Sequence, residues 1–199
     1  MPPKDPTPTD TTEASDEALM AAYCAGDVAG FNALYARHQG KLYRYVLRTV
    51  QAPQVASDVF QDTWMKLVQA VDGWKAAQRV APWLYTVARN RALDHVKLFK
   101  NQVYETPAFE SEDESQGSDD GLDDLSSVVH NQRLGAALIA VVETLPPPQR
   151  DAFLLQAEAG LSLDEIAQIT GANAETVKSR LRYARAALKT LLKQGGWHD

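Results

Sequence analysis

A dense group of cations lies near the carboxyl end of the chain, in "ITGANAETVKSRLRYARAAL" (169–188) and the residues just after it. No acid follows Glu175 there. Lys and Arg side chains bind phosphates through charge, and they hydrogen-bond guanine edges in the major groove. We therefore expect a DNA-contacting set made of Lys178, Ser179, Arg180, Arg182, Arg185 and Lys189.

The same stretch carries apolar residues at helical spacing, so we expect a helix with one buried face and one basic face. Ser162 and Glu165 form a capping-box pattern that opens a short helix reaching Thr170, and Gly171 can supply a left-handed cap. Asn173 is a suitable cap for a long second helix that stops at Gly195–Gly196. A basic helix alone is often only a solvated surface, but this arrangement predicts a helix-turn-helix whose second helix enters the major groove. The stripe expected to be buried is Val177, Leu181, Ala184, Leu188 and Leu191.

Aromatic and basic side chains alternate in "WKAAQRVAPWLYTVARNRALDHVK" (74–97). Single-stranded nucleic acid needs charge for its backbone and flat rings for its unstacked bases. Trp83, Thr86 and Asn90 share one helix face by spacing. The alternative is that the tryptophans belong to the core. The residues expected to contact melted DNA are Lys75, Arg79, Trp83, Thr86, Arg89, Asn90 and Lys97.

A third stretch, "ASDVFQDTWMKLVQAV" (56–71), places Asp58, Gln61 and Asp62 along one side of a helix. Val59 and Leu67 can pack on its other side.

The elements that position these residues all have a helical pattern, and no convincing strand pattern is present. Asp27 is a plausible N-cap for a helix with apolar positions from Phe31 to Thr49, and Pro53 suits the first position of a helix that runs toward Val71. Further helices are expected at 16–25, from near Pro82, at 128–144 and at 147–159. The predicted fold class is all-α.

Charge and composition predict two small helical domains joined by a flexible acidic linker. Residues 101–127 carry nine acids and no cation. Residues 16–100 carry eleven cations and seven acids, and residues 128–199 carry eight cations and seven acids. We assign a disordered tail at 1–15, a first domain at 16–100, the linker at 101–127 and a second domain at 128–199. A linker of this length reaches roughly 30–90 Å. We expect its charge to keep the basic domains apart, unless the segment is only a spacer.

Several classes of function find no support in the residues. Cys24 is the only cysteine, and the four histidines form no metal-ligand spacing with one another or with it. We see no phosphate-binding loop and no nucleophile elbow, so we expect no catalytic residue, no metal and no cofactor. No apolar run is long enough to cross a bilayer, and we expect a cytoplasmic protein without membrane insertion.

The motifs together resemble the bacterial RNA polymerase sigma factors of the extracytoplasmic-function group. The resemblance covers about 16–195 and is carried by "DVFQDTWMKL", "PWLYTVARNRALDHVK", "LPPPQRDAFLL" and "LSLDEIAQITGANAETVKSRLRYARAAL" in the family's order. It implies that 16–100 is region 2, which binds core polymerase and melts and reads the −10 element. It implies that 128–199 is region 4, which reads the −35 element.

The resemblance also assigns partners and roles. It implies contact of Asp58, Gln61 and Asp62 with the clamp helices of core polymerase, base contact by Asn90, and −35 contact by Lys178, Ser179 and Arg182. It implies promoter DNA as a partner and an anti-sigma factor as a regulator. The competing hypothesis is a free-standing helix-turn-helix regulator that binds duplex DNA as a dimer, which leaves 53–71 and 74–100 without a role.

Overall fold

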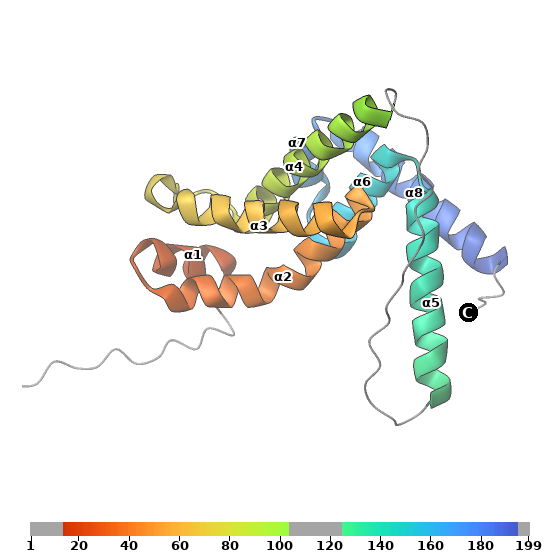
Figure 1. The fold of residues 1–199 in the computed structure, drawn as a ribbon, viewed down its shortest axis with the longest axis horizontal. Coiled ribbons are helices and arrows are strands. Elements are labelled where there is room, and N and C mark those ends of the chain that lie inside the picture. The colour runs from red at the N-terminus through yellow and green to blue at the C-terminus, as the bar shows by residue number, and fades with distance from the viewer. Residues whose placement is uncertain (1–13, 104–124, 195–199) are drawn as a thin grey trace, which may run out of the picture.

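The structure is a computed structural model that describes residues 14–103 and 125–194 of the 199-residue chain. All regular structure in these two ranges is helical, which confirms the predicted fold class (Figure 1). The elements are α1 (Asp16–Cys24), α2 (Val28–Val50), α3 (Pro53–Gln69), the 3-10 turn η1 (Val71–Gly73), α4 (Val80–Val103), α5 (Leu125–Thr144), α6 (Pro147–Ala159), α7 (Leu163–Thr170) and α8 (Ala174–Gln194).

Local signals set most helix ends where the sequence predicts them. The Asp27 carboxylate accepts the N–H of Ala29 at 2.9 Å, and Pro53 is the first residue of α3. The prediction near Pro82 is two residues late, because α4 begins at Val80. Proline is tolerated there because the N–H groups of a first helical turn have no partner within the helix.

Helices α1, α3 and α4 pack against the buried face of α2, and we call α1 to α4 the first half. Leu34, Leu42, Tyr45 and Val46 are fully buried on this face, as their spacing predicts. Helix α1 crosses α2 so closely that a Cβ on Gly30 would lie 2.4 Å from the carbonyl oxygen of Leu19. Any larger residue at this position would therefore force the two helices apart.

An ion-pair network fastens α1 to α2. The Asp16 carboxylate lies 2.7 Å from Nε2 of His38 and 2.6 Å from Nη1 of Arg37. Burial raises the pKa of Asp16, but the hydrogen bonds and positive charges of His38 and Arg37 outweigh it and hold the pKa below its usual value. The charged carboxylate thus stabilises the start of the first half.

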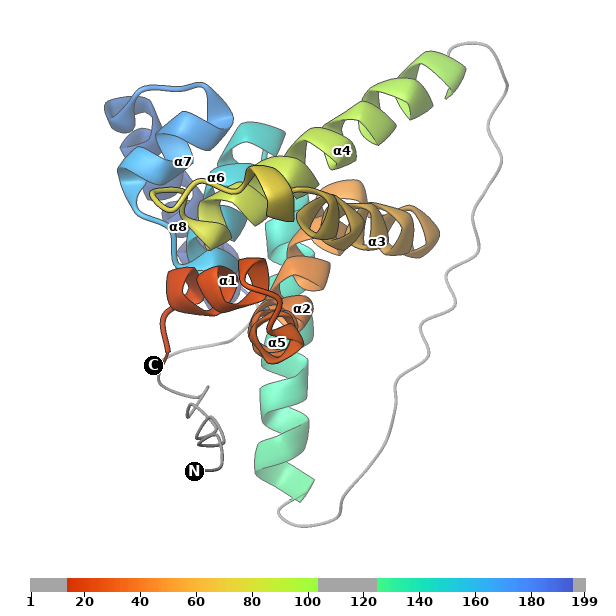
Figure 2. The ribbon, with the colours of Figure 1, turned by 90° about the vertical axis from the view of Figure 1, so that its left-hand side faces the viewer.

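Helices α5 to α8 form the second half, whose buried side chains include Leu154, Leu155 and Ile166. Helix α5 packs against α8 near one end and otherwise extends away from the body as an arm (Figures 1 and 2). None of the helices that the structure describes combines the length and hydropathy needed to cross a membrane.

The two halves pack directly against each other, with α6 on α2 and α4, and α7 on α4 (Figure 2). Their buried apolar residues form one connected core. The structure therefore lacks the separation expected from the acidic linker. The physical reason is that carboxylates of the second half pair with arginines of the first, for example Asp151 with Arg89 at 2.7 Å.

The predicted boundaries fall partly outside the described residues, which exclude 1–13, 104–124 and 195–199. Most of the predicted acidic linker and of the predicted tail lies there. Helix α4 continues to Val103 and α5 begins at Leu125, so helix extends three residues into the predicted linker from each side. The domain boundaries themselves stay a prediction.

Candidate nucleic-acid interface

Helix α8 separates a buried stripe from a basic face. Four predicted stripe residues are buried, whereas the side chain of Leu191 lies outside the described set. Lys178, Arg182, Arg185 and Lys189 follow one another at intervals of three or four residues, so they share one face of the helix. All four are exposed, and the side chain of Lys178 is 67% exposed. The basic face is therefore open to a ligand while the opposite side anchors the helix.

The cations of this face contact only groups of their own half in the described structure. Lys178 Nζ lies 3.7 Å from the exposed Glu175 carboxylate one turn earlier, and Arg185 donates to Gln156 Oε1 at 2.6 Å. The Arg182 guanidinium lies 5.0 Å from the centre of the exposed Tyr183 ring. Such exposed contacts are weak, so they leave the cations available to phosphates.

The other two predicted members of the set are half-buried. Ser179 lies three residues before Arg182 and borders the basic face, whereas Arg180 lies more than a quarter-turn from each of the four exposed cations. The structure thus places Arg180 on another side of α8 and Ser179 at the edge of the basic face.

The turn before α8 has the geometry that the sequence predicts. Gly171 ends α7 with φ 65° and donates its N–H to Ala167 O, and the Asn173 side chain accepts from Thr176 N at 2.7 Å. Ser162 and Glu165 form the predicted capping box. Burial raises the pKa of Glu165, but hydrogen bonds from Ser162 and the charge of Arg79 outweigh it, so the pKa lies below its usual value.

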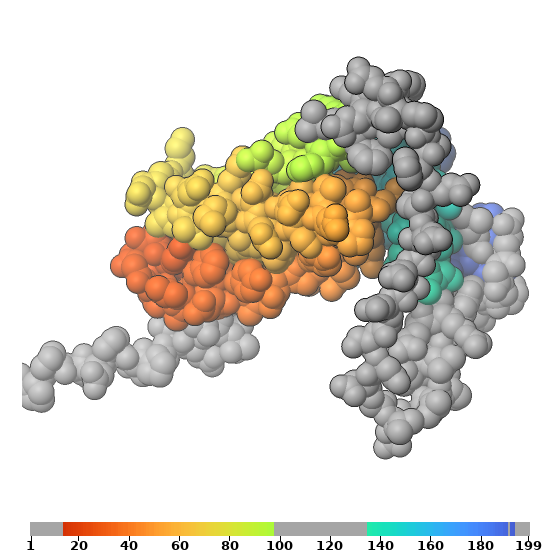
Figure 3. Space-filling view, in the orientation of Figure 1, coloured from red at the N-terminus to blue at the C-terminus, as the bar shows by residue number. Residues whose placement is uncertain are grey.

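Helix α4 and the loop before it hold the aromatic and basic residues of the first half. Trp83, Thr86, Asn90 and Lys97 share one face by spacing, with Asn90 and Lys97 exposed and the other two half-buried. The Trp83 ring meets Trp74 edge to face, with centroids 5.3 Å apart. The loop that leads into α4 is exposed at several positions, Lys75 among them, and its yellow atoms project from one end of the body in Figure 3.

Arg79 and Arg89 do not join this face. Nε of Arg89 donates to Asp151 Oδ2 at 2.7 Å, and its Nη1 donates to the carbonyl of Ile169 at 3.2 Å. Arg79 pairs with Glu165 and lies 3.7 Å from Glu17. Two predicted DNA-contacting arginines are therefore occupied by groups of the second half.

The outer side of α3 carries the third predicted set. Asp58, Gln61 and Asp62 are all exposed. Met65 and Val68 continue the same side of the helix and are 59% and 42% exposed, which sequence reasoning missed. Met65 lies three residues after Asp62 and Val68 lies three residues after Met65, so helical spacing places both on this side of α3. The result is an acidic and apolar strip on the surface of the first half.

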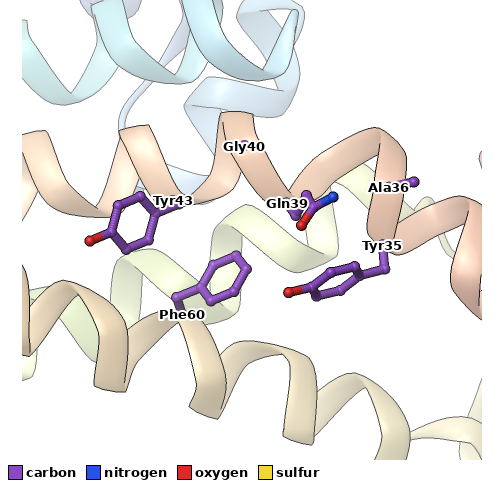
Figure 4. A pocket seen from close by; sticks show the side chains of 6 residues that line it. All are labelled: Tyr35, Ala36, Gln39, Gly40, Tyr43 and Phe60. Carbon is purple, nitrogen blue, oxygen red and sulfur yellow. The ribbon is translucent and has the colours of Figure 1, made fainter. Parts of the chain in front are cut away.

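A shallow hollow lies between α2 and α3, where the rings of Tyr35 and Tyr43 flank that of Phe60 (Figure 4). Tyr43 meets Phe60 edge to face with ring centroids 5.8 Å apart.

No group of three His, Cys, Asp or Glu side chains in the described residues could hold a metal ion.

Family models match both halves. The model for Sigma-70 region 2 matches residues 34–98, and the model for Sigma-70 region 4 matches residues 135–188. The extracytoplasmic-function (ECF) RNA polymerase sigma-E factor of Escherichia coli K12 is 30% identical over 177 residues, which cover 87% of this chain and 92% of that protein. The RNA polymerase sigma-H factor of Pseudomonas aeruginosa is 26% identical over 185 residues, covering 92% and 96%.

Solved structures share the fold. The sigma factor RpoE of Bartonella quintana, solved in complex with the anti-sigma factor NepR, matches with a TM-score of 0.66 and 24% identity over 84% of this chain and 98% of that one. CnrH, solved in complex with the cytosolic domain of CnrY, matches with a TM-score of 0.62 and 23% identity over 91% and 99%. With both sigma regions matched in order and an ECF sigma factor related over most of its length, the chain belongs to the extracytoplasmic-function sigma factors, which direct RNA polymerase to promoters.

Proposed function

We propose that this sigma factor divides promoter recognition between its two halves, with α8 of the second half reading the −35 element. The observation that carries this is the open face of Lys178, Arg182, Arg185 and Lys189 on a helix held by a buried stripe. In a helix-turn-helix the residues near the start of the second helix meet base edges. We assign base contact to Lys178 and Arg182, and phosphate contact to Arg185 and Lys189.

The first half melts and reads the −10 element in this proposal. Asn90 and Lys97 are exposed on the face of α4 that also carries Trp83 and Thr86, and Lys75 is exposed in the preceding loop. Exposed cations beside aromatic rings suit an unpaired strand, since charge meets the backbone and rings meet bases. Arg79 and Arg89 belong to the same set once they are free of their present partners.

The strip on α3 is the proposed contact with the clamp helices of core polymerase. Asp58, Gln61 and Asp62 supply polar contacts, and Met65 adds exposed apolar surface at the centre of the strip. An interface core of apolar side chains with polar groups around it is typical of specific protein contacts.

The proposal includes a regulator and a place of action. The RpoE structure is a complex with an anti-sigma factor, and we propose that an anti-sigma factor also controls this chain. It acts in the cytoplasm, where it meets polymerase, and it performs no catalysis of its own. Its two domains correspond to residues 16–100 and 128–199.

The test is transcription in vitro with purified core polymerase and a genomic DNA library, followed by sequencing of the transcript starts. We expect starts that share two upstream elements and that require both the chain and core polymerase. A free-standing regulator would instead bind duplex DNA as a dimer and direct no new starts, and that result would refute the proposal. Asp58→Asn, Gln61→Ala and Asp62→Asn should reduce complementation by weakening core binding.

A further inference from the structure

The hollow between α2 and α3 is lined mainly by aromatic rings (Figure 4). Tyr35 and Tyr43 project from α2, and Phe60 projects from α3. The hollow encloses about 450 Å³, which is within the usual range of ligand sites, and its remaining lining is Ala36, Gln39 and Gly40. Each lining residue is exposed or half-buried, so a ligand can reach all of them from solvent.

The rings form a preorganised set. The Phe60 ring meets Tyr35 and Tyr43 edge to face, with centroids 6.2 and 5.8 Å away. The buried ring of Trp64 packs on the same set, 4.8 Å from Tyr35 and 6.2 Å from Phe60. Edge-to-face contacts of this kind are favourable and hold rings in place. A ligand would therefore meet surfaces that need little rearrangement.

Hydrogen-bond donors beside these rings lack partners within the part of the chain that the structure describes. The Trp64 indole N–H is buried there without an acceptor, and the hydroxyls of Tyr35 and Tyr43 make no hydrogen bond. A buried N–H without a partner is rare in proteins, because its desolvation is not compensated. Donors around aromatic rings suit a ligand that offers carbonyl oxygens.

Gly40, at the edge of the hollow, is not explained by helix packing. Glycine in a helix interior is destabilising relative to alanine. A Cβ on Gly30 would collide with backbone, whereas a Cβ on Gly40 would meet only the end of the Arg44 side chain, at 3.4 Å. Packing thus requires the first glycine and not the second. The absence of a side chain at Gly40 leaves the hollow wider.

The amino-terminal segment of this chain has the chemistry that such a hollow binds. Four of its first eight residues are proline, namely Pro2, Pro3, Pro6 and Pro8. The spacing of Pro3 and Pro6 places both rings on one face of a polyproline II helix, which has three residues per turn. This helix makes no internal hydrogen bonds, so its carbonyl oxygens stay available. Grooves lined by aromatic rings are a recurrent binding site for such segments.

The segment is long enough to reach the hollow. The described chain starts at Ala14, and Asp16 lies 2.6 Å from Arg37 of α2. Arg37 lies nearly opposite Tyr35 around α2, so the segment must pass half-way round a helix about 10–12 Å thick, a path of about 20 Å. Pro6 lies eight residues before Ala14, and an extended chain of this length spans about 26–29 Å.

We propose that the hollow between α2 and α3 binds residues 2–8 of the same chain as a polyproline II segment. The rings of Pro3 and Pro6 lie against the tyrosines and Phe60, and segment carbonyls accept from the free donors. Tethering favours this occupant over a second copy, because a short flexible connection gives an effective concentration in the millimolar range. Even a weak contact is then well populated.

The docked segment also affects the strip on α3 that is the proposed contact with core polymerase. Gln61 directly follows Phe60, and Val68 lies four residues after Trp64, so the strip borders the hollow. A segment in the hollow therefore covers one edge of the strip and competes with polymerase. This competition rests on the proposed function, whereas the docking rests on the hollow and the segment alone.

The test detects the segment at the hollow in the full-length chain. A spin label is attached at Thr9→Cys in a Cys24→Ser background, and the seven tyrosines carry fluorine for NMR. Replacement of Tyr35 and Tyr43 by Phe, one at a time, identifies their signals. The reference signal is that of Tyr183, which is exposed on α8 of the second half.

Two variants remove the two sides of the contact, and each has a matched control. Pro3→Ala with Pro6→Ala changes the segment, and its control is Thr11→Ala with Thr12→Ala. Gly40→Leu fills the hollow, and its control is Gly135→Leu, at a helical glycine of α5 with open space around it. Circular dichroism checks that the helices persist. Should Gly40→Leu unfold, the proline variant decides alone.

We expect the label to broaden the signals of Tyr35 and Tyr43 and to leave that of Tyr183 sharp. The broadening should be lost in the proline variant and in Gly40→Leu, and it should remain in both controls. No broadening in the labelled chain, equal broadening of Tyr183, or full broadening in the proline variant would overturn the docking. Broadening in a mixture of labelled chains without fluorine and unlabelled chains with fluorine would show that a second copy supplies the segment, which also contradicts the proposal.

Binding to core polymerase separates this proposal from the proposed function. The proline variant should bind core about three-fold more tightly if the segment occupies the hollow about two-thirds of the time. Its control should bind as the full-length chain does. Unchanged affinity together with the expected broadening would support the docking and contradict the placement of the polymerase contact on α3.

Discussion

The two basic surfaces of this sigma factor differ in what their cations touch. Among the residues that the structure describes, the cations of α8 contact only neighbours of their own half, such as Gln156 for Arg185, and the four on its basic face remain exposed. Beside α4 the two arginines Arg79 and Arg89 are held by carboxylates of the other half. The same residue types therefore stay open on α8, whereas beside α4 Arg89 is covered and Arg79 is paired although its side chain is 63% exposed; we call this second surface the covered region.

This difference shows that the number of cations on a surface does not determine how many of them are available to bind a ligand. A cation is available when its partners are exposed and weak, and it is withheld when a buried carboxylate holds it. The side chain of Arg89 is 17% exposed, whereas that of Lys178 is 67% exposed. The availability of each surface is thus a property of the packing around it.

The largest expected effect comes from a change in the buried stripe that supports the basic face of α8. Leu181→Ala, at a side chain 2% exposed, should lower the free energy of unfolding by about 2–5 kcal/mol, because it leaves a cavity under α8. Urea unfolding followed by circular dichroism measures this. The control Lys178→Ala, on the basic face, should stay within about 0.5 kcal/mol of wild type. Equal stability for both variants would mean that the stripe does not anchor α8.

The next prediction distinguishes the residues of the basic face of α8 that contact bases from those that contact phosphates. Lys178→Ala and Arg182→Ala should each lose about 1–3 kcal/mol of discrimination between the correct and an altered −35 element. Arg185→Ala and Lys189→Ala should weaken binding equally on all sequences and lower the salt dependence. Holoenzyme binding to promoter fragments at several salt concentrations measures both. A uniform loss in all four variants would contradict the assignment of base contacts.

A smaller effect is expected from the exposed face of α4, next to the covered region. Asn90→Ala should slow opening of duplex promoters about ten-fold, about 1.4 kcal/mol, and leave core binding unchanged. Trp83→Ala should do the same and also lose its contact with Trp74. Promoters with a pre-melted bubble should partly restore both variants, because the unpairing cost is already met. A Trp83→Ala variant that is equally defective on melted templates, and unfolded, would show that the ring is core.

The smallest expected effect lies at Glu165, which caps α7 and also touches Arg79 of the covered region. Glu165→Ala should cost about 1 kcal/mol through loss of the capping box. Glu165→Gln keeps an acceptor for the cap and should cost only about 0.3 kcal/mol, since Arg79 is largely exposed.

The pH dependence of these variants follows from the lowered pKa of Glu165. The folded state binds this proton less readily than the unfolded state, so the stabilisation is fully present above the usual pKa of about 4.3 and is lost as pH falls through the lowered value. Thermal unfolding between about pH 6 and pH 3 should show wild type approaching Glu165→Gln at the acid end. A constant difference across this range would contradict the charge contribution.

Prediction from sequence succeeds where the cause is local. Asp27, Pro53, the Ser162–Glu165 box and Gly171 act within one turn of the chain, and each appears in the structure as predicted. The helix periods also identify the buried faces of α2 and α8, because a 3.6-residue repeat of apolar side chains needs no knowledge of the partner. Met65 and Val68 were missed because their spacing places them on the side of Asp62 but does not show that apolar side chains there are exposed.

The sequence by itself determined the helices, their caps, the apolar stripes and the residue types that identify an ECF sigma factor. Only the tertiary structure decided which cations are free, because that depends on pairs such as Arg89 with Asp151 and Arg44 with Glu158, which are 62 and 114 residues apart. Capping bonds and helical periods are short-range and recur in every protein, so they can be inferred one segment at a time. Ion pairs between the halves arise only when packing brings distant side chains together and removes the water between them.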